Sequence, residues 1–164
     1  MLRNTSPLML PPELHLDGSG LQIGIIVARY NWDITGMMLQ LAQEELLRLK
    51  VAPKKITVLV VPGAYELAIA AQELLRREHF DALICFGCVM KGETRHDVVI
   101  SDVAAQGLQK VALETHIPII FGVMCAENQE QAEARISRGT ECARSAVEMA
   151  CTIQALASSV DVNR

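Results

Sequence analysis

The segment after an apolar run at residues 82–89 has the strongest chemical character in this sequence. It reads Met90-Lys-Gly-Glu-Thr-Arg-His96 and ends where the next helical pattern begins. Histidine exchanges protons near neutral pH, so His96 is a candidate general acid or base. Gly92 permits a tight turn, and backbone N–H groups close to a helix start favour an anion. The segment predicts an anion site beside a proton-exchanging side chain, although solvated loops commonly share this composition.

Other segments that end apolar runs contribute an aromatic ring and a carboxylate. Tyr30 follows the first run, where its ring either stacks on a planar ligand or packs against the sheet. Phe121 is expected to end the fourth strand. The segment after the second run supplies Ala64, Tyr65 and Glu66. The convergence of an aromatic, an anion site, a histidine and a carboxylate is more informative than any one of them.

Four repeats of a short apolar run and an amphipathic segment explain how these residues meet. Each run predicts a buried strand and each amphipathic segment a helix. Such repeats indicate a parallel sheet with helices on both faces, so the expected fold class is α/β, a three-layer α/β/α sandwich with a four-stranded sheet. A ligand is expected at the carboxyl ends of the strands. The predicted strands are 21–28, 56–61, 82–89 and 117–123, and the predicted helices are 35–50, 65–77, 97–115 and 128 to about 156.

Length and composition limit the classes of protein that fit. The 164 residues suit one domain, which we assign to residues 21–164, with residues 1–20 as an extended N-terminal arm because they contain three prolines and no periodicity. The formal net charge of -4 provides no basic surface for nucleic acid. A hydrophobic content of 51% in so small a chain favours an oligomer.

Apolar runs are too short for a membrane span, which needs roughly 20 residues. The first twenty residues also lack the continuous apolar stretch of a secretory signal. We therefore expect a cytoplasmic protein with no membrane association.

Five cysteines are an odd number, and most of them fall within predicted strands or helices, which indicates reduced, buried thiols. Cys85-Phe-Gly-Cys88 has the spacing of a redox or zinc motif, but no second cysteine pair or paired histidines complete a metal site. No metal is expected, and the pair is interpreted as part of the core.

Six segments, in order and spacing, resemble the 6,7-dimethyl-8-ribityllumazine synthase family, also called the riboflavin synthase beta-chain family. The resemblance extends from about Leu21 to Leu156. The segments are Ile23-Gly-Ile-Ile-Val-Ala-Arg-Tyr-Asn31, Val61-Pro-Gly-Ala-Tyr-Glu66, Phe86-Gly-Cys-Val-Met-Lys-Gly-Glu-Thr-Arg-His96, Leu113-Glu-Thr-His-Ile-Pro-Ile-Ile-Phe-Gly-Val123, Glu127-Asn-Gln-Glu-Gln-Ala132 and Glu148-Met-Ala150.

This resemblance implies a flavodoxin-like fold and the penultimate step of riboflavin biosynthesis. The family condenses 5-amino-6-(D-ribitylamino)uracil with 3,4-dihydroxy-2-butanone 4-phosphate to 6,7-dimethyl-8-ribityllumazine, without metal or organic cofactor. It also implies a homo-oligomer, a pentamer or a sixty-subunit shell, with each active site at a subunit interface.

The resemblance further implies the part that each residue plays in binding the ribitylaminouracil. Tyr30 would stack on the pyrimidine. Ala64 and Glu66, with Tyr65 between them, would hold the ribityl chain and nearby polar groups. The pyrimidine edge would bind the backbone of Val89 and Met90.

A second group is implied for the phosphate and the proton transfers. His96 would shuttle protons, Phe121 would reach the ring from the neighbouring subunit, and Arg135 would pair with the phosphate across the interface. The residues implied to cradle the phosphate are Gly92, Glu93 and Thr94.

Two departures from the family pattern bear on the chemistry. Asp97, followed by Val98 and Val99, replaces the usual aromatic after the histidine and would act as a helix N-cap or tune His96. A shortened segment leaves Arg135 and Arg138 as alternative phosphate ligands, and both would be solvated helix charges if neither binds phosphate.

Two alternatives to an active enzyme follow. One is a family-like oligomer that binds flavin or lumazine without catalysis. The other is a flavodoxin-like module that has no ligand and acts through protein contacts.

Overall fold

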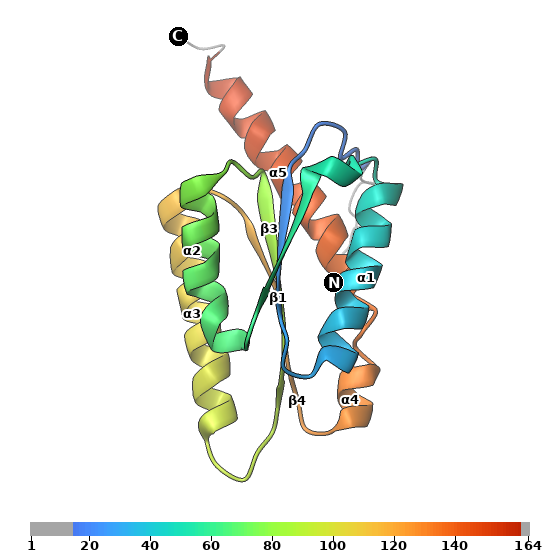
Figure 1. Ribbon diagram of the computed structural model, residues 1–164. Helices are drawn as coiled ribbons and strands as arrows, with labels where there is room; N and C mark the ends of the chain where they lie inside the picture. The colour runs from blue at the N-terminus through green and yellow to red at the C-terminus, as the bar shows by residue number, and fades with distance from the viewer. Residues whose placement is uncertain (1–14, 162–164) are drawn as a thin grey trace, which may run out of the picture.

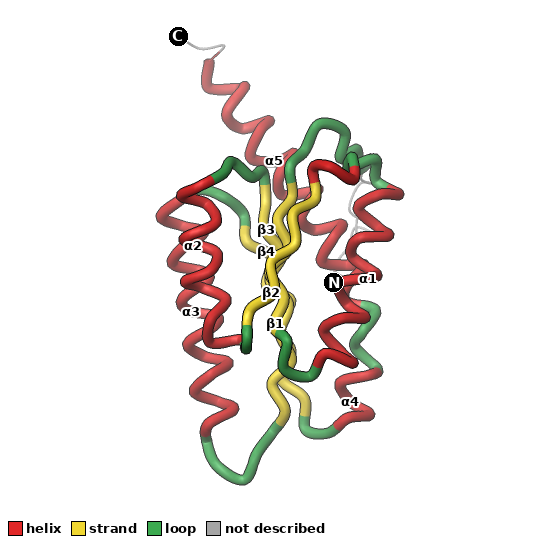
Figure 2. The backbone as a smooth tube through the Cα atoms, viewed as in Figure 1, coloured by secondary structure: helices red, strands yellow, loops and turns green. Residues whose placement is uncertain are grey.

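The computed structural model describes residues 15–161, in which four parallel strands form one sheet in the order β2-β1-β3-β4 (Figure 2). Helices α2 and α3 cover one face of the sheet and α1, α4 and α5 the other (Figure 1). The predicted three-layer sandwich is thus confirmed. The strands are β1 (Ile23–Ala28), β2 (Ile56–Val61), β3 (Ala82–Met90) and β4 (Ile119–Ala126), and the helices are α1 (Trp32–Arg48), α2 (Leu67–Arg77), α3 (His96–Thr115), α4 (Gln129–Glu133) and α5 (Arg138–Asp161), with short 3-10 turns η1 (Pro53–Lys55) and η2 (Ala64–Glu66).

The central strands β1 and β3 are continuously apolar because both of their faces are covered. One core lies between the sheet and helices α1 and α5 and includes Ile25, Met38 and Val147. The other lies toward α2 and α3 and includes Phe80 and Leu108. Alternate residues of one strand therefore enter different cores.

The fourth helical segment is divided, contrary to the single helix expected from residue 128 to about 156. Helix α4 ends at Glu133, and the next residues form tight turns in which the N–H of Arg135 donates to the carbonyl of Ala132 at 3.0 Å. Gly139 then packs directly on the backbone of Met38, where a side chain would collide. The start of α5 is thus in close contact with α1, which the helix-forming composition of residues 128–156 does not reveal.

The fourth strand also differs from the expected range of 117–123. It runs from Ile119 to Ala126, because Met90 at the end of β3 pairs with Ala126. Phe121 therefore lies near the beginning of β4 and does not end it, so that expectation was wrong.

Residues 1–14 of the predicted arm lie outside the described residues. Within residues 15–20, the N–H of Gly18 donates to the carbonyl of Leu49 at 2.7 Å, and Leu16 packs against the core beside α1. The boundary at residue 20 stays a prediction.

A buried carboxylate joins α1 to α5. Glu45 is 6% exposed and accepts hydrogen bonds from Arg48 on its own helix, at 2.8 and 2.6 Å, and from Arg144 on α5, at 2.6 Å. The Arg48 hydrogen bonds and then the Arg144 hydrogen bond hold the pKa of Glu45 at about 2, against burial, which raises it. Because the folded-state pKa lies below the usual value of 4.5, this carboxylate stabilises the fold above that pH.

We expect Glu45→Gln to lower the free energy of unfolding by about 2 kcal/mol at pH 7, because Arg48 and Arg144 lose the negatively charged carboxylate to which both donate. The difference from the unsubstituted protein should shrink as the pH falls from 4.5 toward about 2, where the native carboxylate is protonated. Urea unfolding at fixed protein concentration over this pH range measures it. A stability difference that does not change with pH would contradict the lowered pKa of Glu45.

Candidate active site

The strands β1 and β3 separate at their carboxyl ends, and the candidate site lies where they part. Their last paired residues are Val27 and Phe86, whereas β3 continues to Met90 paired with β4. The chain after β1 instead follows β2, since the N–H of Tyr30 donates to the carbonyl of Pro62 at 3.0 Å. This is the point where the strand order reverses, the usual place for a ligand in an open parallel sheet.

A cavity of about 590 Å³ opens at this separation. Its size is in the range of small-molecule sites. It contains seven of the predicted residues, and the chain also brings there several that were not predicted. The predicted residues are Tyr30, Ala64, Tyr65, Glu66, Val89, Met90 and His96, and the additional ones are Ala28, Asn31, Gly63, Cys88 and Ile100.

One wall of the cavity is a corner in which Tyr30, Gly63 and Glu66 lie against one another. The Tyr30 side chain is 62% exposed, so most of its ring is open to a ligand. A carboxylate oxygen of Glu66, Oε2, accepts a hydrogen bond of 2.9 Å from the backbone N–H of Gly63. This bond fixes the carboxylate at the start of η2, where it can also accept from ligand hydroxyls.

Asn31 is a site residue that the sequence reasoning did not identify. Its backbone has φ 58°, in the left-handed region that asparagine tolerates, and its carbonyl accepts from the N–H groups of Ile34 and Thr35 at 3.0 Å each. Its side-chain Nδ2 donates to the carbonyl of Cys88 at 2.7 Å. Asn31 thereby ties the start of α1 to the open edge of β3. The only signal in the sequence was an asparagine three residues after the end of a strand, which is too common to assign a role.

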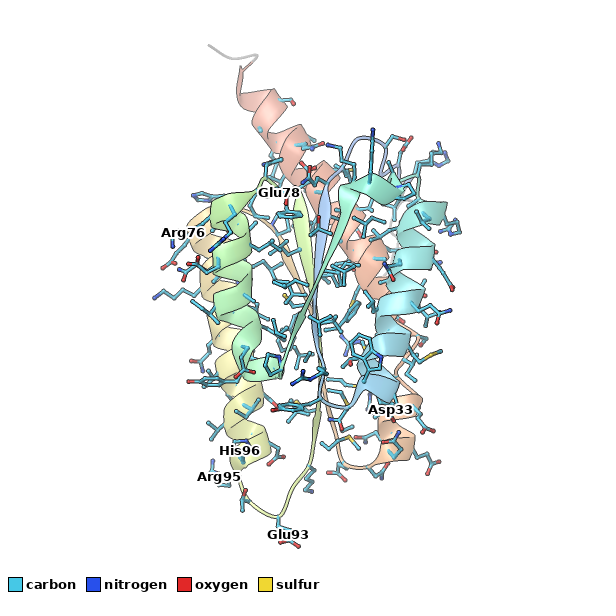
Figure 3. The ribbon with its side chains drawn as sticks, viewed as in Figure 1. Asp33, Arg76, Glu78, Glu93, Arg95 and His96 are labelled. Carbon is cyan, nitrogen blue, oxygen red and sulfur yellow. The ribbon has the colours of Figure 1, made fainter. Side chains whose placement is uncertain are left out.

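His96 is the first residue of α3, which covers the face of the sheet opposite α1, and it lines the cavity. Its backbone N–H donates to Thr94 Oγ1 at 3.3 Å, and its side chain is exposed. Figure 3 shows Glu93 at the tip of the loop before it, with Arg95 and His96 together at the helix start. Gly92, Glu93 and Thr94 are all exposed beside the cavity rather than part of its lining.

The remaining predicted residues do not line this cavity. Phe121 is 39% exposed and lies in a hollow between α3 and β4 with Leu113 and Ile119. Arg135 lines a smaller polar hollow, of about 460 Å³, with Lys91 among its neighbours. Arg138 is the exposed first residue of α5.

Asp97 is not the N-cap of α3, because Arg95 occupies that position without a side-chain hydrogen bond. Asp97 lies in the first turn and lines the polar hollow with Arg135. An acidic residue there still favours the positive end of the helix dipole.

The cysteine pair of the Cys85-Phe-Gly-Cys88 segment enters opposite cores, so the two thiols are on different faces of the sheet. Burial raises the pKa of Cys85, and that of Cys88 to about 11, which opposes thiolate chemistry. All five cysteines are free, but Cys125 is exposed, contrary to expectation, because the end of the edge strand β4 is only partly covered. Among the described residues no cluster of three His, Cys, Asp or Glu side chains is close enough to hold a metal ion.

The helices within residues 15–161 include none with the length and hydropathy needed to cross a bilayer.

Known proteins resemble this chain in sequence over most of its length. A sequence model of the family described as 6,7-dimethyl-8-ribityllumazine synthase matches residues 20–154. The chain belongs to the lumazine synthase family. It is 41% identical over 145 residues to a protein of that name from Azoarcus sp. (strain BH72), covering 88% of this chain and 93% of the relative. The lumazine synthases of Nitrosomonas europaea and Bordetella petrii are 42% and 41% identical, covering 87% and 95% of this chain and 87% and 89% of the relatives.

Within this lumazine synthase fold, we expect Asn31→Asp to lower the free energy of unfolding by about 1–3 kcal/mol, because a carboxylate would then face the Cys88 carbonyl without a donor. Asn31→Gly retains the left-handed backbone and should lower the free energy of unfolding by about 1 kcal/mol. Chemical denaturation of both variants measures the difference. Equal stability of Asn31→Asp and the unsubstituted protein would show that the hydrogen bond has no role.

Proposed function

We propose that this protein condenses 5-amino-6-(D-ribitylamino)uracil with 3,4-dihydroxy-2-butanone 4-phosphate to form 6,7-dimethyl-8-ribityllumazine, the penultimate step of riboflavin biosynthesis. The observation that carries the proposal is the cavity at the separation of β1 and β3, which combines an exposed aromatic ring, an anchored carboxylate, an open strand edge and a histidine in a member of this family. These groups match the planar ring, the hydroxyls and the proton transfers of that reaction.

The ribitylaminouracil is assigned to the wall between β1 and β3. The Tyr30 ring stacks on the pyrimidine, and the backbone of Val89 and Met90 binds its polar edge, because this length of β3 has no strand beside it on the β1 side. Ala64, Tyr65 and Glu66 hold the ribityl chain. Since Glu66 Oε2 already accepts from Gly63, the carboxylate is oriented before the substrate arrives.

The chemistry needs positioned substrates and proton transfers rather than a strong nucleophile. The 5-amino group of the uracil attacks the ketone and water leaves to give an imine, and phosphate is then eliminated. The ribitylamino nitrogen attacks the remaining carbonyl carbon, and a second water leaves as the ring closes. His96 moves protons in these steps. The loop of Gly92, Glu93 and Thr94 receives the phosphate, where backbone N–H groups near the start of α3 stabilise the leaving anion.

A homo-oligomer completes the site in this proposal. Phe121 and Arg135 lie outside the cavity of their own chain, which supports a role for both in the cavity of a neighbouring copy. The α3 and β4 surface that would meet this copy exposes large apolar side chains, including Val99, Val103 and Leu113. A pentamer is proposed, with the sixty-subunit shell left as the alternative assembly. The cytoplasmic location likewise remains a prediction.

The protein should form lumazine from the two substrates faster than the uncatalysed background, as followed by lumazine fluorescence. His96→Ala should reduce the rate by about tenfold to a thousandfold, because proton transfer is lost while binding and positioning remain. Melting temperature and sedimentation velocity are the controls for folding and assembly. A background rate from folded oligomer would favour the non-catalytic relative that binds flavin or lumazine, and a stable monomer would contradict a site shared between subunits.

Arg135→Ala should raise the KM for the butanone phosphate more than Arg138→Ala does. Arg135 is half-buried, its Nη1 donates to the carbonyl of Gln131 at 3.2 Å, and it lines a polar hollow with Lys91, whereas Arg138 is exposed. An arginine held in place loses less entropy when it pairs with a phosphate. The two variants remove the same charge only a few residues apart, so each controls for the other, and the reverse order would assign the phosphate to Arg138.

A further inference from the structure

We propose that Gly63 is a positioning residue for ligand stacking, because the absence of a side chain at this position determines where the Tyr30 ring stands. The inference rests on the proposed function, in which Tyr30 stacks on the pyrimidine. Gly63 itself needs no direct contact with the reacting atoms.

A side chain at position 63 would collide with the Tyr30 ring in its present position. A Cβ atom at position 63 would lie 2.8 Å from Cδ2 and 3.0 Å from Cε2 of the Tyr30 ring. It would also lie 3.3 Å from Glu66 Oε2, a distance that a small movement of the carboxylate relieves. The ring therefore occupies the space that a methyl group would require.

The backbone does not require glycine at this position. Gly63 has φ -145° and ψ -178°, an extended conformation that alanine adopts without strain. The need for glycine is consequently one of space beside an aromatic ring and not of conformational freedom.

An added methyl group should move the ring rather than the backbone. The backbone at Tyr30 is fixed, because its N–H donates to Pro62 and the N–H of Arg29 donates to Val61 at 2.8 Å. The ring, by contrast, is 62% exposed and can rotate into the cavity, which it lines. If the ring rotates away from Gly63, it either fills space that a planar ligand needs or changes the tilt of the ring face on which that ligand stacks.

The test compares four proteins: the unsubstituted chain, Gly63→Ala, Tyr30→Ala and the double variant. Their dissociation constants for 6,7-dimethyl-8-ribityllumazine are measured by fluorescence titration, together with KM and kcat in the condensation assay. Gly63→Ala should weaken lumazine binding by about five- to fiftyfold, the scale of one stacking contact, and raise the KM for the ribitylaminouracil. Because only binding is altered, kcat should stay within about twofold.

The double variant distinguishes action through the ring from other causes. If Gly63 acts through Tyr30, Gly63→Ala should have little further effect on a chain that already carries Tyr30→Ala. The same loss in both backgrounds would mean that the methyl group acts through Glu66 or the backbone, and this would overturn the proposal.

Gly36→Ala is a matched control from the adjoining helix α1. A Cβ at position 36 would lie 2.9 Å from Cε2 and Nε1 of Trp32, which is 45% exposed and does not line the cavity. The control therefore places the same methyl group against another exposed aromatic ring. It should leave lumazine binding unchanged, and melting temperatures should show that both alanine variants fold.

Failure of the inference and failure of the proposed function have different signatures. If the unsubstituted protein is active and Tyr30→Ala weakens binding, but Gly63→Ala binds normally, the positioning role alone is wrong. If the unsubstituted protein neither binds lumazine nor forms it, the proposed function fails and the inference falls with it.

Discussion

The site depends on one constraint, which is that β3 is paired over a greater length with β4 than with β1. β3 is paired with β4 as far as Met90, but with β1 only as far as Phe86. Backbone groups cannot be left unsatisfied in a closed core, so this extra length of β3 must lie where a side chain, water or a ligand can reach it. Asn31 satisfies the Cys88 carbonyl, and the edge beyond it opens on the cavity. The site is thus a consequence of strand register.

The same separation sets the direction of the chain after β1. By continuing along β2, the backbone carries Tyr30 toward Gly63 and away from β3. The aromatic ring and the Glu66 carboxylate consequently form one wall, while His96 reaches the cavity from the start of α3. The Glu66 carboxylate and His96 thus come from separate elements, η2 and α3, that lie on the same face of the sheet.

A single chain leaves part of the predicted machinery away from the cavity. Phe121 is on β4 and Leu113 is on α3, at the edge of the sheet that lies furthest from β2. Exposed apolar surface of this kind is stabilised when another copy covers it. Under the proposed function, assembly and catalysis are therefore coupled, because the contacts that bury this surface also bring the missing aromatic and arginine to a site. The buried Glu45 cluster has a different part, since it holds α5 against α1 within one chain.

The sequence by itself determined the βα repeats, the parallel sheet and the sheet edge at which the cavity opens, because the apolar period is local and the connections between parallel strands follow general rules of topology. Seven of the thirteen predicted site residues could be grouped in one cavity for the same reason: they lie at the ends of strands or soon after them. Only the tertiary structure showed the break before α5, next to the close contact of Gly139 with Met38, and the position of Phe121, which depends on register between β3 and β4. The roles of Asn31 and Gly63 were not predicted, because each depends on a residue far away in the sequence. Asn31 donates a hydrogen bond to Cys88 on another strand, and Gly63 leaves the space that the Tyr30 ring occupies. Contacts of this kind produce no periodic pattern in the sequence.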